Sequence, residues 1–359
     1  IRPTKLAYTE IATGGCFEKL FENMQVSAEN TALVKTILDV QKGYYKKGGQ
    51  DLYVSLPFCP TKCEYCSFIT APIEKTRQYV DEYVNCVVKE LYSIKPIIKD
   101  LRSIYIGGGT PFVLENDKLT PIYAAINDIF DGKAEYTVEA GRPDVFTEEK
   151  LKCAKDYGVT RICVNPQSFN DSTLIKIGRK HTAAQTLRAY EMAAKYGFDI
   201  NIDLIAGLAE ETPKDFEYSL DAAIALNPAN ITVHTLSLKS GAKLKENIKK
   251  LDVEGVADMI ALSREKLSGA GYQPYYLYRQ KYQAGGLENV GWAKRGKACV
   301  YNIDVMEEIS DNVAVGANAI SKRLYGDEDR IERYASPKDI ASYISKTGEI
   351  IEKRLKLFE

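Results

Sequence analysis

Three cysteines stand close together in the first part of the chain and could hold a metal cluster. Cys59, Cys63 and Cys66 form a C-x3-C-x2-C run directly after an apolar segment. Thiolates are soft ligands that favour iron–sulfur and zinc chemistry. A structural zinc finger usually takes four ligands in two separated pairs, whereas the chain's only histidines, His181 and His234, lie more than a hundred residues away. Three thiolates on a four-iron cluster would leave one iron open for chemistry.

The same run, with Tyr65 directly before its last cysteine, resembles the cluster motif of the radical S-adenosylmethionine (SAM) superfamily. The resemblance implies a [4Fe-4S] cluster on Cys59, Cys63 and Cys66, whose fourth iron binds the amino and carboxylate groups of SAM. It also implies that the reduced cluster splits SAM into methionine and a 5′-deoxyadenosyl radical. A zinc site, or three unconnected thiols, is the alternative interpretation.

Size, charge and cysteine content describe an ordinary globular protein. A length of 359 residues predicts one large α/β domain with appendages, and a net charge of −1 shows no nucleic-acid footprint. No apolar run approaches the ~20 residues that cross a bilayer, and no signal peptide is found. Eight cysteines in a chain without export signals indicate a reducing compartment, so we expect a cytoplasmic protein. Because the sequence starts at Ile1 and not at Met, we expect an N-terminal region to be missing.

Short apolar strands alternate with amphipathic helices from residue 51 onward. We expect strands at residues 52–56, 103–106, 136–139, 160–165, 199–204 and 231–235. Helices are expected near residues 76–94, 118–130, 148–157, 183–196 and 213–226. This alternation predicts a parallel sheet with helices outside it. Six units are too few for a closed eight-stranded barrel, so we predict an α/β fold with a partial (β/α)6 TIM-like barrel, which the resemblance also implies.

The remaining chain is expected to flank this barrel. We predict a helical N-terminal extension over residues 1–49, the radical SAM core over 50–240, and an α+β C-terminal part that covers the substrate over 241–359. Within the last part, residues 253–270 and 337–359 are expected to form amphipathic helices.

Polar or glycine-rich residues end all six expected strands. Ligands gather at the carboxyl ends of parallel strands, so we expect one active-site rim there. The glycines at 107–109 would let the backbone approach a ligand closely, and a carboxylate that ends an apolar strand needs a partner. The resemblance places several of these residues at SAM-contacting positions, with structural polar groups as the alternative. The expected SAM-contacting residues are Tyr53, Tyr65, Gly108, Gly109, Thr110, Glu139, Gln167, Arg179 and Asp203.

A tyrosine-rich segment follows residue 271. In an extended chain the alternate residues from 276 to 282 would share one face, with cationic residues on the other. Aromatic rings interleaved with cations suit a flat ligand that carries several carboxylates. A tyrosine-rich sheet that only packs on the barrel is the alternative. The candidate substrate-binding residues are Tyr278, Arg279, Lys281, Arg295 and Lys322.

Five further cysteines carry no motif. We expect them to be small core hydrophobes, and only Cys299, in a loop-like segment, has a reactive role as the alternative. The other four are Cys16, Cys86, Cys153 and Cys163.

Segments beyond the cysteines narrow the resemblance. Residues 138–144, 161–167, 177–182, 232–236, 275–281 and 287–291 resemble the oxygen-independent coproporphyrinogen III oxidase-like enzymes, most of all the HemZ or coproporphyrinogen dehydrogenase branch. The chain departs from relatives at 207–211, where they tend to read Gly-Leu-Pro-Gly-Glu, and at 55–57, where many read His-Ile-Pro. These departures bear on the substrate more than on radical generation.

The resemblance implies an oxidoreductase of porphyrin and haem biosynthesis that works without oxygen. The leading hypothesis is oxidative decarboxylation of coproporphyrinogen III propionates to vinyl groups, with a [4Fe-4S] cluster and one or two SAM molecules. Flavodoxin or ferredoxin would donate electrons, and no nucleic acid or membrane partner is expected. The second hypothesis is a methyltransferase or ring-opening enzyme of the same fold, and the third is a non-catalytic haem or cluster carrier.

Overall fold

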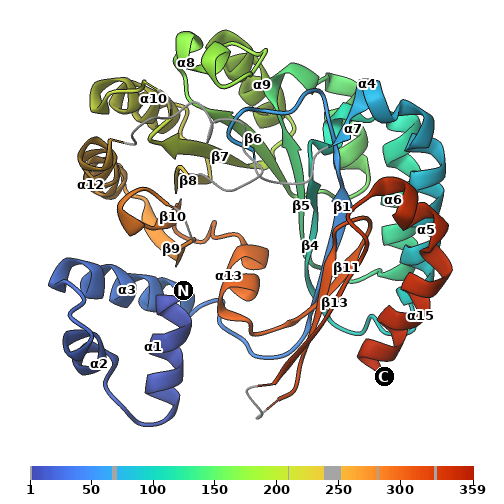
Figure 1. Ribbon diagram of the computed structural model, residues 1–359, viewed down its shortest axis with the longest axis horizontal. Helices are drawn as coiled ribbons and strands as arrows, with labels where there is room; N and C mark the ends of the chain where they lie inside the picture. The colour runs from blue at the N-terminus through green and yellow to red at the C-terminus, as the bar shows by residue number, and fades with distance from the viewer. Residues whose placement is uncertain (1, 67–70, 209, 238–251, 281–282, 327–329) are drawn as a thin grey trace.

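The six expected strands form a continuous parallel sheet (Figure 1). The computed structural model describes residues 2–66, 71–208, 210–237, 252–280, 283–326 and 330–359. In spatial order the strands are β1 (Gln50–Leu56), β4 (Leu101–Gly108), β5 (Glu135–Gly141), β6 (Arg161–Gln167), β7 (Asp199–Ala206) and β8 (Asn230–Thr235). The prediction of a partial barrel of six units is therefore confirmed.

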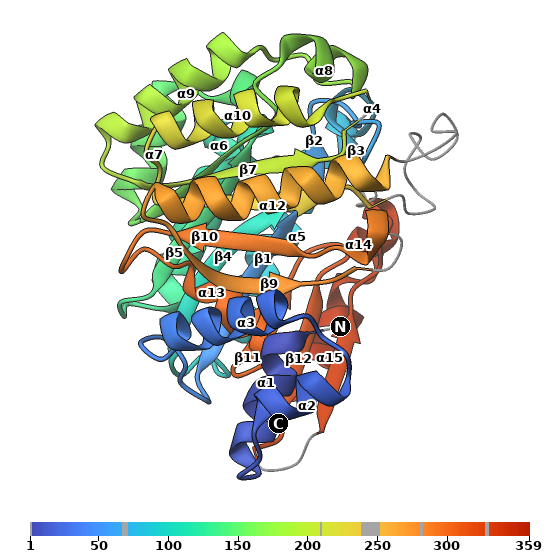
Figure 2. The same cartoon turned by 90° about the vertical axis from the view of Figure 1, so that its left-hand side faces the viewer.

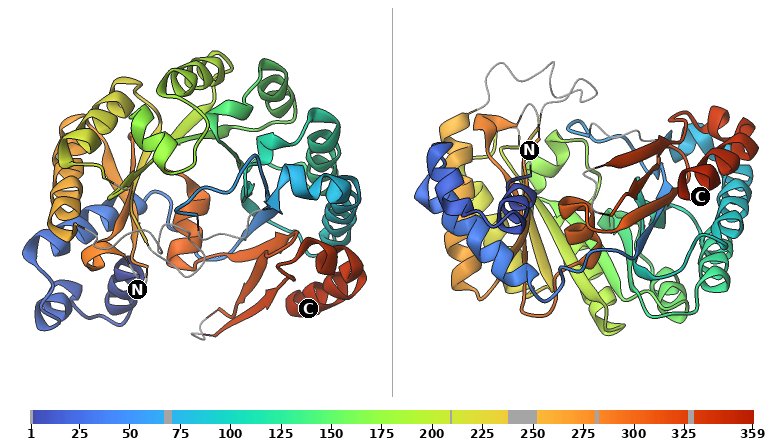
Figure 3. Two further views of the ribbon diagram at one scale, coloured as in Figure 1. Left: turned by 45° about the horizontal axis from the view of Figure 1, so that its top comes forward. Right: turned by 90° about the horizontal axis from the view of Figure 1, so that it is seen from below.

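Helices between the strands cover the outer side of this curved sheet (Figure 3). They are α5 (Val80–Ile94), α6 (Asn116–Ile129), α7 (Glu148–Asp156), α9 (Ala183–Lys195), α10 (Pro213–Ala225) and α12 (Val253–Gly269). The helix expected over 76–94 begins later, because a 3-10 turn separates α5 from the short α4 (Ile73–Thr76), and α8 (Asp171–Lys176) was not expected. No described helix has both the length and the hydrophobicity of a membrane span.

The N-terminal extension is helical, as predicted. It contains α1 (Pro3–Ala12), α2 (Phe17–Asn23) and α3 (Ala28–Gln41). Its apolar side chains, among them Phe21 and Ile37, join a core that also contains side chains of β7, β8 and α12. The extension therefore packs on the end of the sheet beyond β8, where α3 lies against β9 (Gln273–Tyr278).

The C-terminal residues extend the same sheet at both edges, which local sequence patterns did not predict. β10 (Asn289–Ala293) pairs with β8 and β9 (Gln273–Tyr278) pairs with β10, both antiparallel. At the opposite edge β11 (Asp311–Val315) runs parallel to β1 and is followed by β12 (Ile320–Leu324) and β13 (Ile331–Ala335). Helix α13 (Val300–Glu307) connects the two edges. The three-part division stays a prediction, and its boundary at residue 240 lies outside the described residues.

Buried polar contacts attach the C-terminal end of the chain to the core. The helix expected over 337–359 is two helices, α14 (Ile340–Ser345) and α15 (Thr347–Phe358), because Lys346 between them leaves helical geometry. Arg354 of α15 forms a fully buried ion pair with Glu90 of α5. Tyr83 of α5 donates to the Ser55 carbonyl at 2.7 Å, at the end of β1. These contacts support the strand that leads into the three cysteines.

Candidate active site

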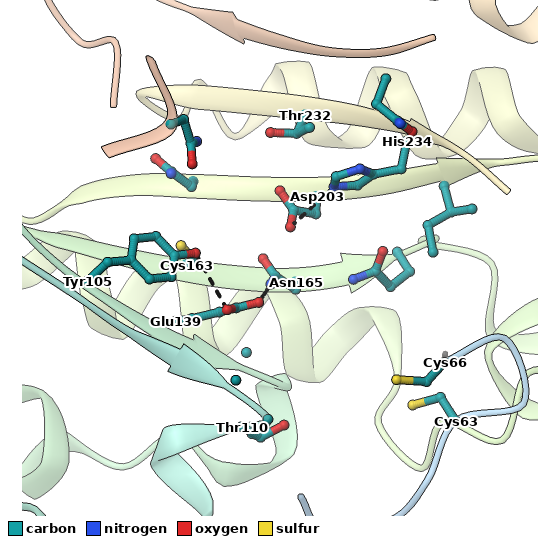
Figure 4. Close-up of a pocket in the computed structure, with 18 of the residues that line it drawn as sticks. Cys63, Cys66, Tyr105, Thr110, Glu139, Cys163, Asn165, Asp203, Thr232 and His234 are labelled. Atoms are coloured by element: carbon teal, nitrogen blue, oxygen red, sulfur yellow. Dashed lines mark hydrogen bonds and ion pairs between the residues drawn. The ribbon is translucent and has the colours of Figure 1, made fainter. Parts of the chain in front are cut away.

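One large pocket lies at the carboxyl ends of the parallel strands. Its volume is about 680 Å³, within the range of sites for small molecules and cofactors. Residues from the ends of all six core strands line it, together with the three cysteines and residues of β9, α13 and β12. Figure 4 shows the sulfur atoms of Cys63 and Cys66 side by side at one end, with Glu139 and Asp203 deeper in the pocket. The structure thus places the strand ends and the cysteine run around one space.

Arg142 holds the first part of the cysteine loop. Its guanidinium is buried and donates to Thr61 Oγ1 at 2.5 Å, between the first two cysteines. The same group forms a two-pronged ion pair with Asp144, at 2.9 and 2.6 Å. Sequence analysis did not single out this arginine, although an Arg-Pro-Asp sequence directly after a strand is a recognisable local signal. The pair fixes the cysteine loop to the end of β5.

Arg179 holds the second part of the loop. Its Nη2 donates to Tyr65 Oη at 2.5 Å and its Nη1 donates to the Asn165 carbonyl at 2.6 Å. Arg179 and Tyr65 both line the pocket, as expected of SAM-contacting residues, but here they bind each other. The observed contacts therefore join the cysteine loop to the end of β6.

The donor chemistry of the three cysteines fits an iron–sulfur cluster. Cys59 and Cys63 are buried, Cys66 is half-buried, and all three line the pocket. Burial raises the pKa of the Cys59 thiol to about 12, so ligation would require this thiol to lose its proton. Among the described residues no three histidine, cysteine or carboxylate side chains are close enough together to hold a metal ion. A [4Fe-4S] cluster would bind each thiolate to a different iron, so it does not need the three sulfur atoms as close together as a single metal ion would.

The glycine run packs tightly against the start of the cysteine loop. The Gly109 amide donates to the Leu56 carbonyl at 2.8 Å, and the Thr110 amide donates to the Phe58 carbonyl at 2.7 Å. A Cβ atom on Gly109 would lie 2.5 Å from the Phe58 oxygen, so only glycine fits. Thr110 also donates to Cys59 Sγ at 3.6 Å. Part of the glycine signal is thus structural, although Gly108, Gly109 and Thr110 line the pocket.

Two carboxylates form the acidic part of the pocket. Glu139 accepts long hydrogen bonds from Tyr105 Oη and Asn165 Nδ2, each at 3.5 Å, and His234 Nε2 lies 3.6 Å from Asp203 Oδ2 (Figure 4). Burial, with a smaller contribution from the nearby Asp203 charge, raises the pKa of Glu139 to about 8. A cation or a hydroxyl donor placed between these carboxylates would stabilise their charged forms.

Two side-chain amide oxygens in the pocket could accept hydrogen bonds from a ligand. Asn165 Oδ1 and Gln167 Oε1 are buried and have no hydrogen-bond partner within the described part of the chain. Gln167 also has a φ of 72°, a conformation that side-chain-bearing residues adopt at a cost and that often marks functional sites. Together with Glu139 and Asp203, these acceptors fit the ammonium, sulfonium and ribose hydroxyl groups of SAM.

Tyrosines form two walls of the pocket. Tyr105 stacks on Tyr301 with ring centroids 4.5 Å apart, and Tyr53 stacks on both. In the second group, Tyr276 and Tyr278 of β9 stack almost in parallel, with an angle of 8° between the rings. These two share one face of an extended segment, as predicted. The walls offer flat apolar surfaces with hydroxyl groups at their edges.

The expected substrate-binding residues do not all come together. Tyr278 and Lys322 line the pocket. Arg279 is exposed, with Nη2 3.8 Å from Glu288, and is not among the lining residues. Arg295 lies at a separate cavity of about 400 Å³ beside α3, so no substrate role is carried forward for it. Lys281 lies outside the described residues.

The other cysteines divide by burial. Cys163 and Cys299 are buried, whereas Cys86 and Cys153 are half-buried. Cys299 donates to Glu135 Oε1 at 3.1 Å, which gives it a structural partner. The prediction that Cys16 belongs to the core is wrong, because it is exposed just before α2.

The chain is similar in sequence and in fold to several known proteins. The profile of the Radical SAM superfamily matches residues 53–223. The oxygen-independent coproporphyrinogen-III oxidase-like protein HemZ of Bacillus subtilis is 36% identical over all of this chain and 76% of its own length. The heme chaperone HemW of Bacillus subtilis is 32% identical over 66% of this chain and 64% of its own length. Coproporphyrinogen III oxidase HemN of Escherichia coli has a similar fold, with a TM-score of 0.69 at 21% identity over 87% of this chain and 72% of its own.

Proposed function

The chain belongs to the radical SAM superfamily, in the family of coproporphyrinogen-III oxidase-like proteins, and from this premise we propose that it oxidatively decarboxylates a propionate-bearing tetrapyrrole. Coproporphyrinogen III is the substrate that we infer, with vinyl groups as the products. The name of the HemZ relative and the cationic side chain of Lys322 in the pocket support this choice.

The observation that carries the proposal is the continuity of the pocket. Its cysteine end offers three thiols and a set of hydrogen-bond acceptors, as a [4Fe-4S] cluster and SAM require. The two groups of stacked tyrosines and Lys322 of β12 line the same space. A flat, carboxylate-bearing substrate could therefore lie against the tyrosines with its reacting carbon toward the cysteines.

When bound, the cluster and SAM supply a 5′-deoxyadenosyl radical that takes a hydrogen atom from a propionate side chain. Loss of carbon dioxide and of one electron, to an acceptor outside this chain, would then leave the vinyl group. The chain's own part is positioning and exclusion of water. Glu139 and Asp203 would accept hydrogen bonds from SAM, and the stacked rings of Tyr276 and Tyr278 would cover the substrate. We infer flavodoxin or ferredoxin as the electron donor.

Anaerobic reconstitution tests the proposal directly. The protein would be loaded with iron and sulfide and given dithionite, SAM and coproporphyrinogen III, while 5′-deoxyadenosine and tetrapyrrole mass are followed together. We expect deoxyadenosine and the loss of two carbon dioxide units per tetrapyrrole. Cys63→Ala should lose both activities and much of its iron, whereas the matched control Cys16→Ala, an exposed cysteine outside the pocket, should keep them. Deoxyadenosine with an unchanged tetrapyrrole would overturn the substrate, and a new mass would indicate methyl transfer or ring opening.

A haem carrier is the second candidate, because the 32% identical relative is named a heme chaperone. The same pocket would then hold haem without turnover. Adding haem to the wild-type protein and to Cys63→Ala separates the two functions. A carrier should bind haem stoichiometrically and leave SAM uncleaved, whereas the proposed enzyme should cleave SAM only with its substrate in place.

A further inference from the structure

Four cationic side chains surround a single carboxylate at the far end of the pocket. Glu308 lies within salt-bridge distance of Arg2 (2.7 Å), Lys5 (2.7 Å), Lys322 (3.2 Å) and Arg333 (3.3 Å). We call these four cations the cationic cluster. One carboxylate cannot neutralise four cations, so the cluster keeps an excess of positive charge.

The cationic cluster is assembled from segments that are far apart in the sequence. Lys5 belongs to α1, Glu308 directly follows α13, and Lys322 and Arg333 belong to β12 and β13. Figure 2 shows α1 below α3 and β9, and the ion pairs of Glu308 link α1 to β12 and β13. Lys322 also lines the main pocket, so the cluster is continuous with the candidate active site.

The electrostatics of the cluster show that its charge is incompletely balanced. Burial alone would raise the pKa of Glu308, but the nearby charges of Lys5, Arg2 and Lys322 lower this pKa to about 2. The pKa of Lys322 is nevertheless lowered, by burial first and then also by Arg2 and Arg333, despite the attraction of Glu308. Glu307 is buried and engaged by Thr4 and by Gln41. A further anion beside Lys322 would thus be favourable.

The side chains at the cysteine end of the pocket explain why the anion would bind at the cationic cluster instead. The cysteine end of the pocket carries the carboxyl groups of Glu139 and Asp203, and its two lining arginines, Arg142 and Arg179, are already engaged, so the described residues there offer a carboxylate no unengaged guanidinium. Carboxylates bind well to arginine and lysine clusters through charge-assisted hydrogen bonds. A ligand with several carboxylates would therefore be oriented with one of them at the cationic cluster.

We propose that the cationic cluster is a carboxylate-binding subsite that docks a propionate of the tetrapyrrole, with Glu308 as the internal counter-ion that it partly replaces. This inference rests on the proposed function for the identity of the ligand. It adds residues of the N-terminal helix, Arg2 and Lys5, to the substrate site. A clasp that only attaches α1 to the C-terminal strands is the competing role.

Porphyrin titrations test the subsite without turnover. Reconstituted protein would be titrated with coproporphyrin III, which has four carboxylates, and with its tetraamide, in which neutral amides replace them. We expect the tetra-acid to bind at least tenfold tighter and its affinity to fall steeply with salt. Lys322→Met should reduce tetra-acid binding at least tenfold and leave tetraamide binding unchanged. Lys353→Gln removes an exposed lysine of α15 and should change neither.

The Glu308→Gln variant distinguishes a carboxylate-binding subsite from a clasp that only attaches α1 to the C-terminal strands. Removing the internal carboxylate frees the cationic cluster, so tetra-acid binding should become several-fold tighter even if thermal stability falls. A clasp predicts lower stability with no gain in affinity, and that result would overturn the proposal. Equal affinity for acid and amide would also overturn it.

The failure of the subsite can be distinguished from the failure of the proposed function. Decarboxylation of coproporphyrinogen III with no effect of Lys322→Met would remove the subsite and keep the function. Charge-dependent porphyrin binding with no decarboxylation would keep the subsite and remove the function.

Discussion

The two ends of the pocket pair their charges in opposite ways. At the cysteine end, the arginines are engaged: Arg142 binds Asp144 and Thr61, and Arg179 binds Tyr65 and a carbonyl. At the far end, four cations share Glu308.

The carboxylates show the reverse pattern. Glu139 accepts hydrogen bonds from the neutral donors Tyr105 and Asn165, whereas Glu308 is surrounded by cations. Paired groups hold a structure in place, and groups with unbalanced charge are available to a ligand. The comparison teaches that the cysteine end suits a ligand with cationic and hydroxyl groups, and the far end suits one with carboxylates.

Replacing Glu139 should give the largest effect. Glu139→Gln removes a carboxyl group that the positive charge of bound SAM would ionise, so SAM affinity should fall by about ten- to a hundredfold. The free protein should become more stable, because burial raises the pKa of Glu139 from 4.5 to about 8. The folded state then favours the neutral carboxyl. The contribution of the neutral Glu139 to the free energy of unfolding is therefore lost as the pH rises from 4.5 through 8. The variant avoids this loss.

Chemical denaturation at pH 5 and pH 8.5 checks the sign. The free energy of unfolding of Glu139→Gln should exceed that of the wild type by about 3 kcal/mol more at the higher pH than at the lower. Glu254→Gln, on the exposed side of α12, serves as control and should show no such difference. A gain that does not depend on pH would mean that Glu139 is already compensated in the free protein.

Replacing Arg142 should lower the stability of the folded protein and loosen the cysteine loop. Arg142→Gln leaves Asp144 without its partner and releases Thr61, so the free energy of unfolding should fall by about 2 kcal/mol. Iron uptake during reconstitution should fall as well, because the cysteine loop loses one attachment. Arg142→Lys keeps the charge without the two-pronged geometry and should be intermediate.

Lys118→Gln, the control, removes surface ion pairs with Asp81 and Asp117 and should leave the free energy of unfolding nearly unchanged. Full iron uptake by Arg142→Gln would show that Arg142 does not position the loop. Reconstituted iron content and urea denaturation measure the two effects separately.

The sequence predicted the parts of the fold that have local patterns. Strand–helix alternation located the six core strands, and the polar residue at each strand end located the pocket rim. The cysteine spacing marked one end of that pocket. Each of these signals lies within a few consecutive residues, which is why it could be recognised.

Long-range pairing had no such signal. The placement of β11 beside β1, some 260 residues earlier in the chain, depends on register and packing that no short segment records. Glu308 forms ion pairs with residues as far apart in the sequence as Arg2 and Arg333, and no pattern around Glu308 indicates these partners. Arg295 shows the converse, because a basic residue near the tyrosine segment proved to face another cavity.

Tyr278 lines the pocket beside His234, and its replacement should give the smallest effect and the finest test. Its ring stacks on Tyr276, and its hydroxyl lies 3.5 Å from His234 Nδ1, whose other nitrogen faces Asp203. Burial raises the pKa of Tyr278 to about 12, so the hydroxyl stays protonated at neutral pH. Tyr278→Phe keeps the ring and should weaken coproporphyrin binding only a few-fold, with SAM affinity unchanged. Tyr278→Leu, which removes the stack, should weaken porphyrin binding more.

Parallel titrations with SAM and coproporphyrin III measure both ends of the pocket in one variant. If Tyr278→Phe lowers only porphyrin affinity, the tyrosine wall serves the substrate and the two ends act independently. If SAM affinity falls equally, the contact through His234 reaches Asp203, and the two ends of the pocket are coupled. The second result would contradict the separation of roles, because a neutral hydroxyl of β9 would then help to hold a carboxylate of β7.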